Sequence, residues 1–96
     1  MQKSKEVSIC QKAIQKYGKS AQMVVAIEEC SELQKALTKT LREQPNLLNI
    51  AEEIADVEIM IEQLKLIFKN ERQVEEFKKH KLMRLEKNLK SVNKTE

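Results

Sequence analysis

The near-absence of glycine and proline limits the possible folds of this chain more than any other feature of its sequence. One glycine and one proline occur among 96 residues, and β-hairpins and tight turns depend heavily on these two residue types. The residues used instead, chiefly Lys, Glu, Leu, Gln, Ala and Met, favour helices. We therefore predict an all-α fold.

The size and composition predict a single domain over residues 1–96, near the lower limit for a self-sufficient core. The chain is 41% hydrophobic and 34% charged, which is typical of a soluble globular protein. No apolar run reaches the roughly 18 residues of a membrane span, and the N-terminus leads into no apolar signal segment. We expect a cytoplasmic protein without a membrane partner. The net charge of +3 is too small to indicate nucleic acid.

The apolar pattern divides into helical segments joined by short connections. We expect four helices, over residues 6–17, 20–42, 46–68 and 70–91. Gly18 suits a left-handed residue after the first helix. The candidate N-caps of the next three are Ser20, Asn46 and Asn70. Because short connections make neighbouring helices antiparallel, we predict a four-helix antiparallel chain.

The two central helices each carry a narrow apolar stripe. In the second helix it comprises Ala26, Cys30, Leu33 and Leu37, and in the third Ile50, Ile54, Val57, Ile61, Leu64 and Phe68. We expect these stripes to face each other. We interpret Cys10 and Cys30 as small core residues. The chain has no CxxC motif and no cluster of histidines, so the sequence gives no indication of a zinc site or a disulfide.

Carboxylates flank both stripes at matching positions. At about 100° per residue, Glu29 and Glu53 lie roughly 60° to one side of their stripes. Glu32 and Asp56 lie roughly 120° to the same side. When two antiparallel helices face each other across their stripes, a local twofold axis keeps both pairs at one edge. The spacing therefore predicts one site formed by four carboxylates.

Acidic residues at helical spacing are usually solvated, and that alternative stands for any one of the four taken alone. Together, without an intervening Lys or Arg, they would repel one another or bind protons unless a cation is present. Carboxylate oxygens suit a hard divalent cation such as Mg²⁺, and Mg²⁺ indicates phosphate chemistry. We therefore predict a metal site. Glu28 points about 100° away from Glu29 and is either solvent-facing or an auxiliary acid.

The motif Glu28-Glu29-x-x-Glu32, followed by Glu53-x-x-Asp56, resembles the EExxE…ExxD signature of the MazG-like all-α nucleoside triphosphate pyrophosphohydrolases. The similarity extends over about residues 17–85. It implies Mg²⁺-dependent (or Mn²⁺-dependent) hydrolysis of a nucleoside or deoxynucleoside triphosphate between the α- and β-phosphates, giving a monophosphate and pyrophosphate. The catalytic metal ligands that it implies are Glu29, Glu32, Glu53 and Asp56.

The resemblance also implies phosphate-binding cations after the ExxD helix, a lysine followed three or four residues later by Arg or Asn. Lys81 and Arg84 match this spacing, and Lys78 lies beside Lys81 in the apolar stripe of the fourth helix. The alternative is that these long side chains cover the stripe while their charges reach solvent.

Gln22 and Asn49 are weaker candidates for contact with a nucleotide substrate. Gln22 lies on the same side of its helix as Glu29, and Asn49 on the same side as Glu53. Each either contacts the substrate or is an ordinary polar neighbour.

Three other interpretations compete with this one. A di-iron carboxylate bundle requires Glu-x-x-His on two helices, whereas the chain has one histidine, His80, preceded three residues earlier by Phe77. A non-catalytic interaction or regulatory module would use the basic fourth helix to meet acidic partners or nucleic acid, but no helix-turn-helix glycine turn is visible. The third is a degenerate or non-catalytic relative of the family, against which the presence of all the motif carboxylates speaks.

The shortage of aromatic mass predicts self-association. Aromatic residues make up only 3% of the chain, so short helices leave apolar surface that a second subunit would bury. The family resemblance implies the same, and we expect a homodimer or homotetramer that forms a helical bundle.

Overall fold

The computed structural model describes residues 1–42 and 46–95, and within these ranges the chain is entirely helical, without strands. The elements are α1 (Lys3–Tyr17), α2 (Lys19–Arg42), α3 (Leu47–Phe68) and α4 (Glu71–Thr95). The predicted all-α class and the number of helices are confirmed. Among the described residues, no helix is both long enough and apolar enough to span a membrane.

The first two connections follow the predicted turn chemistry in part. Gly18 has the expected positive φ of 94°, but its ψ of 153° lies outside the left-handed helical region. Because α2 begins at Lys19, Ser20 lies inside the helix, and the Gly18 carbonyl accepts the first bond from Gln22 N at 3.1 Å. The predicted cap of α3 is confirmed, since Asn46 Oδ1 accepts from the backbone N–H of Asn49 at 3.1 Å.

The connection between α3 and α4 is a short, hydrogen-bonded turn. Lys69 adopts the left-handed conformation (φ 51°, ψ 44°) that usually favours glycine. The N–H of Asn70 donates to the Lys65 carbonyl at 3.3 Å, and the Asn70 carbonyl accepts from Val74 N at 2.9 Å. Asn70 Oδ1 is buried without a hydrogen-bond partner, so the predicted side-chain cap of α4 is not formed.

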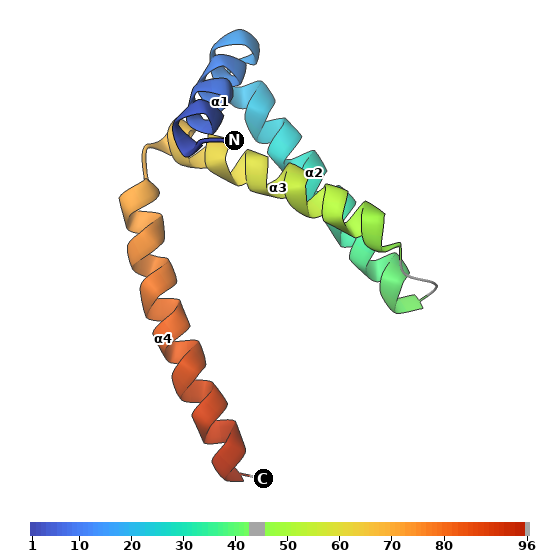
Figure 1. Ribbon diagram of the computed structural model, residues 1–96, viewed down its shortest axis with the longest axis vertical. Coiled ribbons are helices and arrows are strands. Elements are labelled where there is room, and N and C mark those ends of the chain that lie inside the picture. Colours follow the sequence, from blue (N-terminus) through green and yellow to red (C-terminus); the bar gives the residue numbers. More distant parts are fainter. Residues whose placement is uncertain (43–45, 96) are drawn as a thin grey trace.

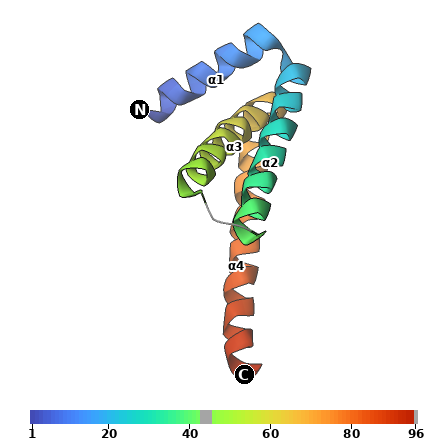
Figure 2. The same cartoon turned by 90° about the vertical axis from the view of Figure 1, so that its right-hand side faces the viewer.

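The helices form a packed part and a projecting part (Figures 1 and 2). α2 and α3 lie side by side and antiparallel, as predicted, and α1 packs against both, while α4 diverges from α3 after the turn. The radius of gyration is 16.9 Å, against about 12.5 Å for a compact chain of this length. One chain alone therefore does not close the expected four-helix bundle.

The core of the described residues is small and lies between α1, α2 and α3. Its buried apolar residues are Cys10, Ala26, Ala36, Met60 and Ile67. Between α2 and α3, Gln22 Nε2 donates to Gln63 Oε1 at 2.7 Å, and both side chains are buried. Both cysteines are free, and Cys30 is exposed, so its predicted place in the core is wrong.

The contact between α2 and α3 is rotated away from the predicted apolar stripes. On α3 the buried residues are Met60, Gln63 and Ile67, whereas Ile54 and Ile61 remain exposed. The buried positions lie about 100° round the helix from the exposed ones, on the side that carries Glu53. On α2, Ala26 of the predicted stripe is buried, but the other buried residues, Gln22 and Ala36, lie to the side of the stripe that carries Glu29. The small side chains of Ala26 and Ala36 permit close approach there. This rotation brings Glu29 and Glu53, which we expected at the edge of the helix pair, partly into the contact between α2 and α3.

Candidate functional site

Three carboxylates from two helices converge where α2 passes α3. One oxygen from each of Glu29, Glu53 and Asp56 lies within 4.8 Å of the other two. Glu29 comes from α2, and Glu53 and Asp56 come from α3. Glu29 and Glu53 are half-buried and Asp56 is exposed, so the group has a protected side and an open side. The convergence that antiparallel packing predicts is therefore present for three of the four carboxylates.

Burial and mutual repulsion both disfavour the ionised form of this group. The pKa of Glu29 is raised above its ordinary value of 4.5, first by desolvation and then by the charge of Asp56. The pKa of Glu53 is raised in the same way, first by desolvation and then by Asp56 and Glu32. All the charged groups that shift these two pKa values are themselves carboxylates, so the surroundings favour a bound proton or cation.

One oxygen of the group is isolated. Glu53 Oε2 is buried and has no hydrogen-bond partner among the described residues. Buried polar atoms are nearly always paired, and leaving one unpaired costs free energy. A cation coordinated by this oxygen would satisfy it. The donor set, three carboxylates with one open side, fits a hard divalent ion that retains water molecules, such as Mg²⁺.

The remaining acids of the motif lie further out. Glu32 is exposed, and its Oε1 lies 3.4 Å from Lys35 Nζ, one turn along the same helix. Its oxygens are outside the group of three, although its charge contributes to the raised pKa of Glu29. Glu28 is exposed on α2. The structure thus separates an inner set of three acids from two outer acids that face solvent.

The polar candidates Gln22 and Asn49 lie outside the acidic group. Gln22 is buried, and its side-chain amide donates to Gln63. Asn49 is half-buried in the first turn of α3, where its backbone N–H completes the helix cap. Sequence reasoning did not identify Gln63. Met60 and Ile67 are seven residues apart and lie on one face of the helix. Gln63 is a polar residue close to that apolar face, and this position is the signal that could have identified it.

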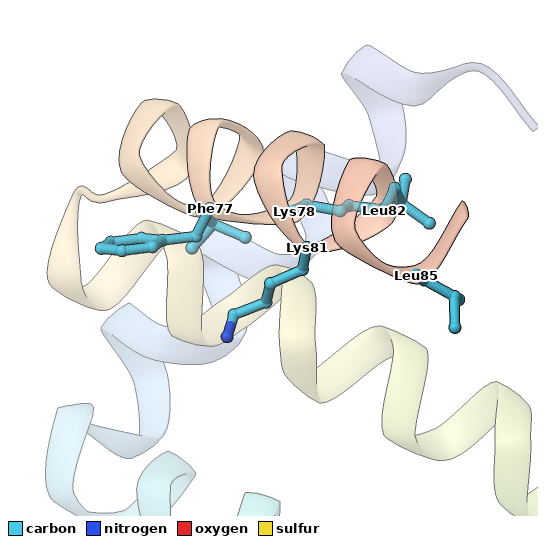
Figure 3. Close-up of a pocket in the computed structure, with 6 residues that line it drawn as sticks. Phe77, Lys78, Lys81, Leu82 and Leu85 are labelled. Atoms are coloured by element: carbon cyan, nitrogen blue, oxygen red, sulfur yellow. The ribbon is translucent and has the colours of Figure 1, made fainter. Parts of the chain in front are cut away.

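The predicted phosphate-binding cations lie on α4. Lys78, Lys81 and Arg84 are all exposed. Lys78 and Lys81 line an open groove of about 560 Å³ (Figure 3), together with Val74, Phe77, Leu82 and Leu85. Over the described residues α4 contacts α3 and makes no contact with α1 or α2. Within one chain, therefore, these cations are not brought to the acidic group.

Comparisons of this chain with protein-family models, with curated proteins and with solved structures find no match. The chemistry of the site therefore rests on its own residues.

Proposed function

We propose that this protein is an enzyme that hydrolyses a nucleoside or deoxynucleoside triphosphate between the α- and β-phosphates, with Mg²⁺ or Mn²⁺ as cofactor. The products are a nucleoside monophosphate and pyrophosphate. The observation that supports this most is the buried, unpaired oxygen of Glu53 inside a group of three carboxylates. The resemblance of the motif to the MazG-like pyrophosphohydrolases gives the proposal its substrate class.

The proposed metal ligands are Glu29, Glu53 and Asp56, with Glu32 as the fourth after it leaves Lys35. A bound divalent ion would offset charge on the phosphate oxygens and position the triphosphate for in-line attack. The half-buried Glu29 and Glu53 would exclude water from one side of the site. A carboxylate of the group would orient the attacking water or accept its proton. Glu28 has the role of an auxiliary acid.

The substrate also needs cations from the protein. Lys81 and Arg84 are the proposed phosphate-binding residues, because they are exposed and match the family spacing. Lys78 is added because it is exposed beside Lys81 on the same helix. Gln22 and Asn49 are left as weaker candidates for the nucleotide, and the hydrogen bond of Gln22 to Gln63 speaks against its availability. We propose that the active form is a homo-oligomer.

One observation favours a second candidate function. α4 is exposed along its length over residues 75–91 and carries both apolar and basic side chains. A non-catalytic interaction module that binds an acidic partner through α4 would account for this exposure. It would leave the convergent carboxylates unexplained.

The test is an assay of the purified full chain with each NTP and dNTP in the presence of Mg²⁺ or Mn²⁺, with pyrophosphate and phosphate measured separately. We expect metal-dependent pyrophosphate release that Glu53→Gln removes. Glu6→Gln is the matched control, since it neutralises an exposed carboxylate on α1. Release of phosphate instead would contradict cleavage between the α- and β-phosphates. No release with any nucleotide would favour the interaction module.

A further inference from the structure

The contact between α2 and α3, which lie side by side and antiparallel (Figure 1), is built in levels seven residues apart. In one level, Gln22 Nε2 donates to Gln63 Oε1 at 2.7 Å. Glu29 lies seven residues after Gln22, and Asp56 lies seven residues before Gln63. Because the helices run in opposite directions, these equal steps reach a common level. Glu29 and Asp56 do meet there, in the acidic group.

The same spacing continues on the other side of the acidic level. One more step of seven residues leads to Ala36 on α2, which is buried, and to Asn49 on α3, which is half-buried. Seven residues are about two turns, or about 10.5 Å of helix. The amide pair therefore lies about 10.5 Å along the helix pair from the level of Glu29 and Asp56.

The acidic level does not hold the two helices together by itself. Glu29, Glu53 and Asp56 bring oxygens within 4.8 Å of one another, and like charges at this distance repel. Over the described residues of α2, the buried apolar side chains are those of Ala26 and Ala36. Such small side chains bury little area and interlock weakly with a facing helix. The repulsion therefore has to be opposed from elsewhere in the contact.

The buried amide pair resists both sliding and separation of the helices. Gln22 and Gln63 are 7% and 4% exposed. Their hydrogen bond holds only within a narrow range of distance and angle, whereas apolar contact has no preferred direction. If α2 slid along α3 or moved away from it, both amides would be left buried and unpaired, which costs free energy. A buried polar residue fixes the register of coiled-coil helices in the same way.

We propose that the hydrogen bond between Gln22 and Gln63 positions the acidic group, because it fixes the register and separation of α2 and α3 two turns away. The connection between Arg42 and Leu47 joins the helices at the opposite end, so the acidic level is held between two fixed points. In this role the two glutamines act through the carboxylates and are not themselves ligands. Their effect on metal binding rests on the proposed function, whereas their effect on helix spacing is measurable without a metal.

The decisive variant removes the hydrogen bond but keeps the packing. Gln22→Leu with Gln63→Leu replaces both amides by apolar side chains of similar size and leaves no unpaired group. Gln22→Met with Gln63→Met gives the same comparison with more adaptable side chains, should the leucine pair fail to fold. Lys3→Gln is the matched control. It removes another polar contact to α3, the 3.1 Å ion pair of Lys3 with Glu62, at the residue next to Gln63 but towards α1.

The first test measures the helix spacing at the acidic level without metal. One spin label is attached to the exposed free thiol of Cys30 on α2, and a second to Glu52→Cys, an exposed position on α3. The buried Cys10 is replaced by alanine, and labelled chains are diluted with unlabelled ones so that only distances within one chain are measured. We expect pulsed electron paramagnetic resonance to find a wider distance distribution in the double-leucine variant than in the wild type or the control. Identical distributions would overturn the positioning role.

The second test measures the dissociation constant of Mn²⁺ alone for the full, unlabelled chain, from the resonance signal of free Mn²⁺. We expect binding about tenfold weaker in the double-leucine variant, at the lower end of the effect of losing an outer partner of a metal ligand, and unchanged in Lys3→Gln. Wild-type affinity in the double-leucine variant would overturn the positioning role. A wild-type chain that bound no Mn²⁺ would contradict the proposed function, and the spacing measurement would still decide whether the amide pair fixes the helices.

Discussion

The antiparallel pair α2–α3 and the projecting helix α4 are built from the same kind of amphipathic sequence, yet they expose opposite kinds of surface. The helix pair directs part of its charge inwards, with Glu29 and Glu53 half-buried in the contact. α4 buries none of its side chains over residues 75–91 and presents its cations and its apolar face together. Among the described residues, no basic side chain forms an ion pair with Glu29, Glu53 or Asp56, and the Lys and Arg side chains of α4 form none with a carboxylate.

The comparison also shows that one helix can hold two packing faces. On α3, Met60 and Ile67 belong to a buried line that includes Glu53, with members seven residues apart. The exposed Ile54 and Ile61 belong to a parallel line about 100° away. The first line is used inside the chain, and the second is left free. This division separates the proposed chemistry on the helix pair from the surface left free for the proposed homo-oligomer.

The largest expected effect concerns the chemistry assigned to the helix pair. Glu53→Gln keeps the shape of the side chain but removes the charge and one oxygen ligand. Loss of an outer partner of a metal ligand costs about 10- to 100-fold, so loss of a ligand should lower metal-dependent pyrophosphate release by more than about 100-fold. Analytical ultracentrifugation should find the oligomer unchanged. Full activity of this variant would remove Glu53 from the site.

The next effect separates the stability of the two regions. Met60 is 5% exposed in the helix pair, and Met60→Ala should lower the free energy of unfolding by about 2–5 kcal/mol at any protein concentration. Leu85→Ala on α4 should instead destabilise by an amount that depends on protein concentration, because in the proposed homo-oligomer its partner is a second chain. Thermal unfolding over a range of concentrations measures both. Equal concentration dependence would erase the distinction between the regions.

The sequence predicts the structure of the α2–α3 pair better than it predicts the course of α4. The ends of α3 at Leu47 and Phe68 follow from the Asn46 cap and the apolar pattern, and the convergence of Glu29 with Glu53 follows from antiparallel packing. The face used between α2 and α3 does not follow, because two parallel lines on α3 both satisfy helical spacing. Choosing between them requires knowing that Ala26 and Ala36 allow close approach on one side.

The course of α4 was not predictable for a different reason. A two-residue connection usually returns the chain antiparallel, but Lys69 in the left-handed conformation turns α4 away from α3. Lysine has no special preference for that conformation, so no local signal announces it. The antiparallel prediction therefore failed at the one connection where backbone conformation, rather than the apolar pattern, decides the direction.

The pH dependence of metal binding tests the inner acids. The pKa values of Glu29 and Glu53 are raised above the ordinary glutamate pKa of 4.5, so the fold favours their protonated forms. These groups therefore stabilise the metal-free fold most at a pH below 4.5. That contribution is lost as the pH rises through the raised values. Mg²⁺ should therefore raise Tm at neutral pH, and the increase should vanish as the pH falls through the raised pKa values. Differential scanning calorimetry with and without Mg²⁺ measures this. An equal increase in Glu53→Gln would mean that Mg²⁺ binds elsewhere.

A smaller effect is expected from the buried amide pair. Gln22→Ala would leave the Gln63 amide unpaired in the α2–α3 contact and should cost about 1–3 kcal/mol. Replacing both by leucine removes the unpaired group and should cost less than the single change. Urea denaturation of the two variants compares them. If the double variant is less stable than Gln22→Ala, the two glutamines stabilise the fold by more than pairing each other's buried amide groups.

The smallest effect compares the two asparagines that precede α3 and α4. Asn46 Oδ1 accepts from Asn49 N at 3.1 Å, whereas Asn70 Oδ1 is buried without a partner. Asn46→Ala should therefore cost about 1 kcal/mol of stability, the usual value of an N-cap. Asn70→Ala loses no bond, and removing an unsatisfied oxygen should leave stability unchanged or raise it slightly. Paired urea denaturation measures the difference. Equal losses would mean that Asn70 forms its cap in solution, and the turn that directs α4 away from α3 would then have a second fixed hydrogen bond.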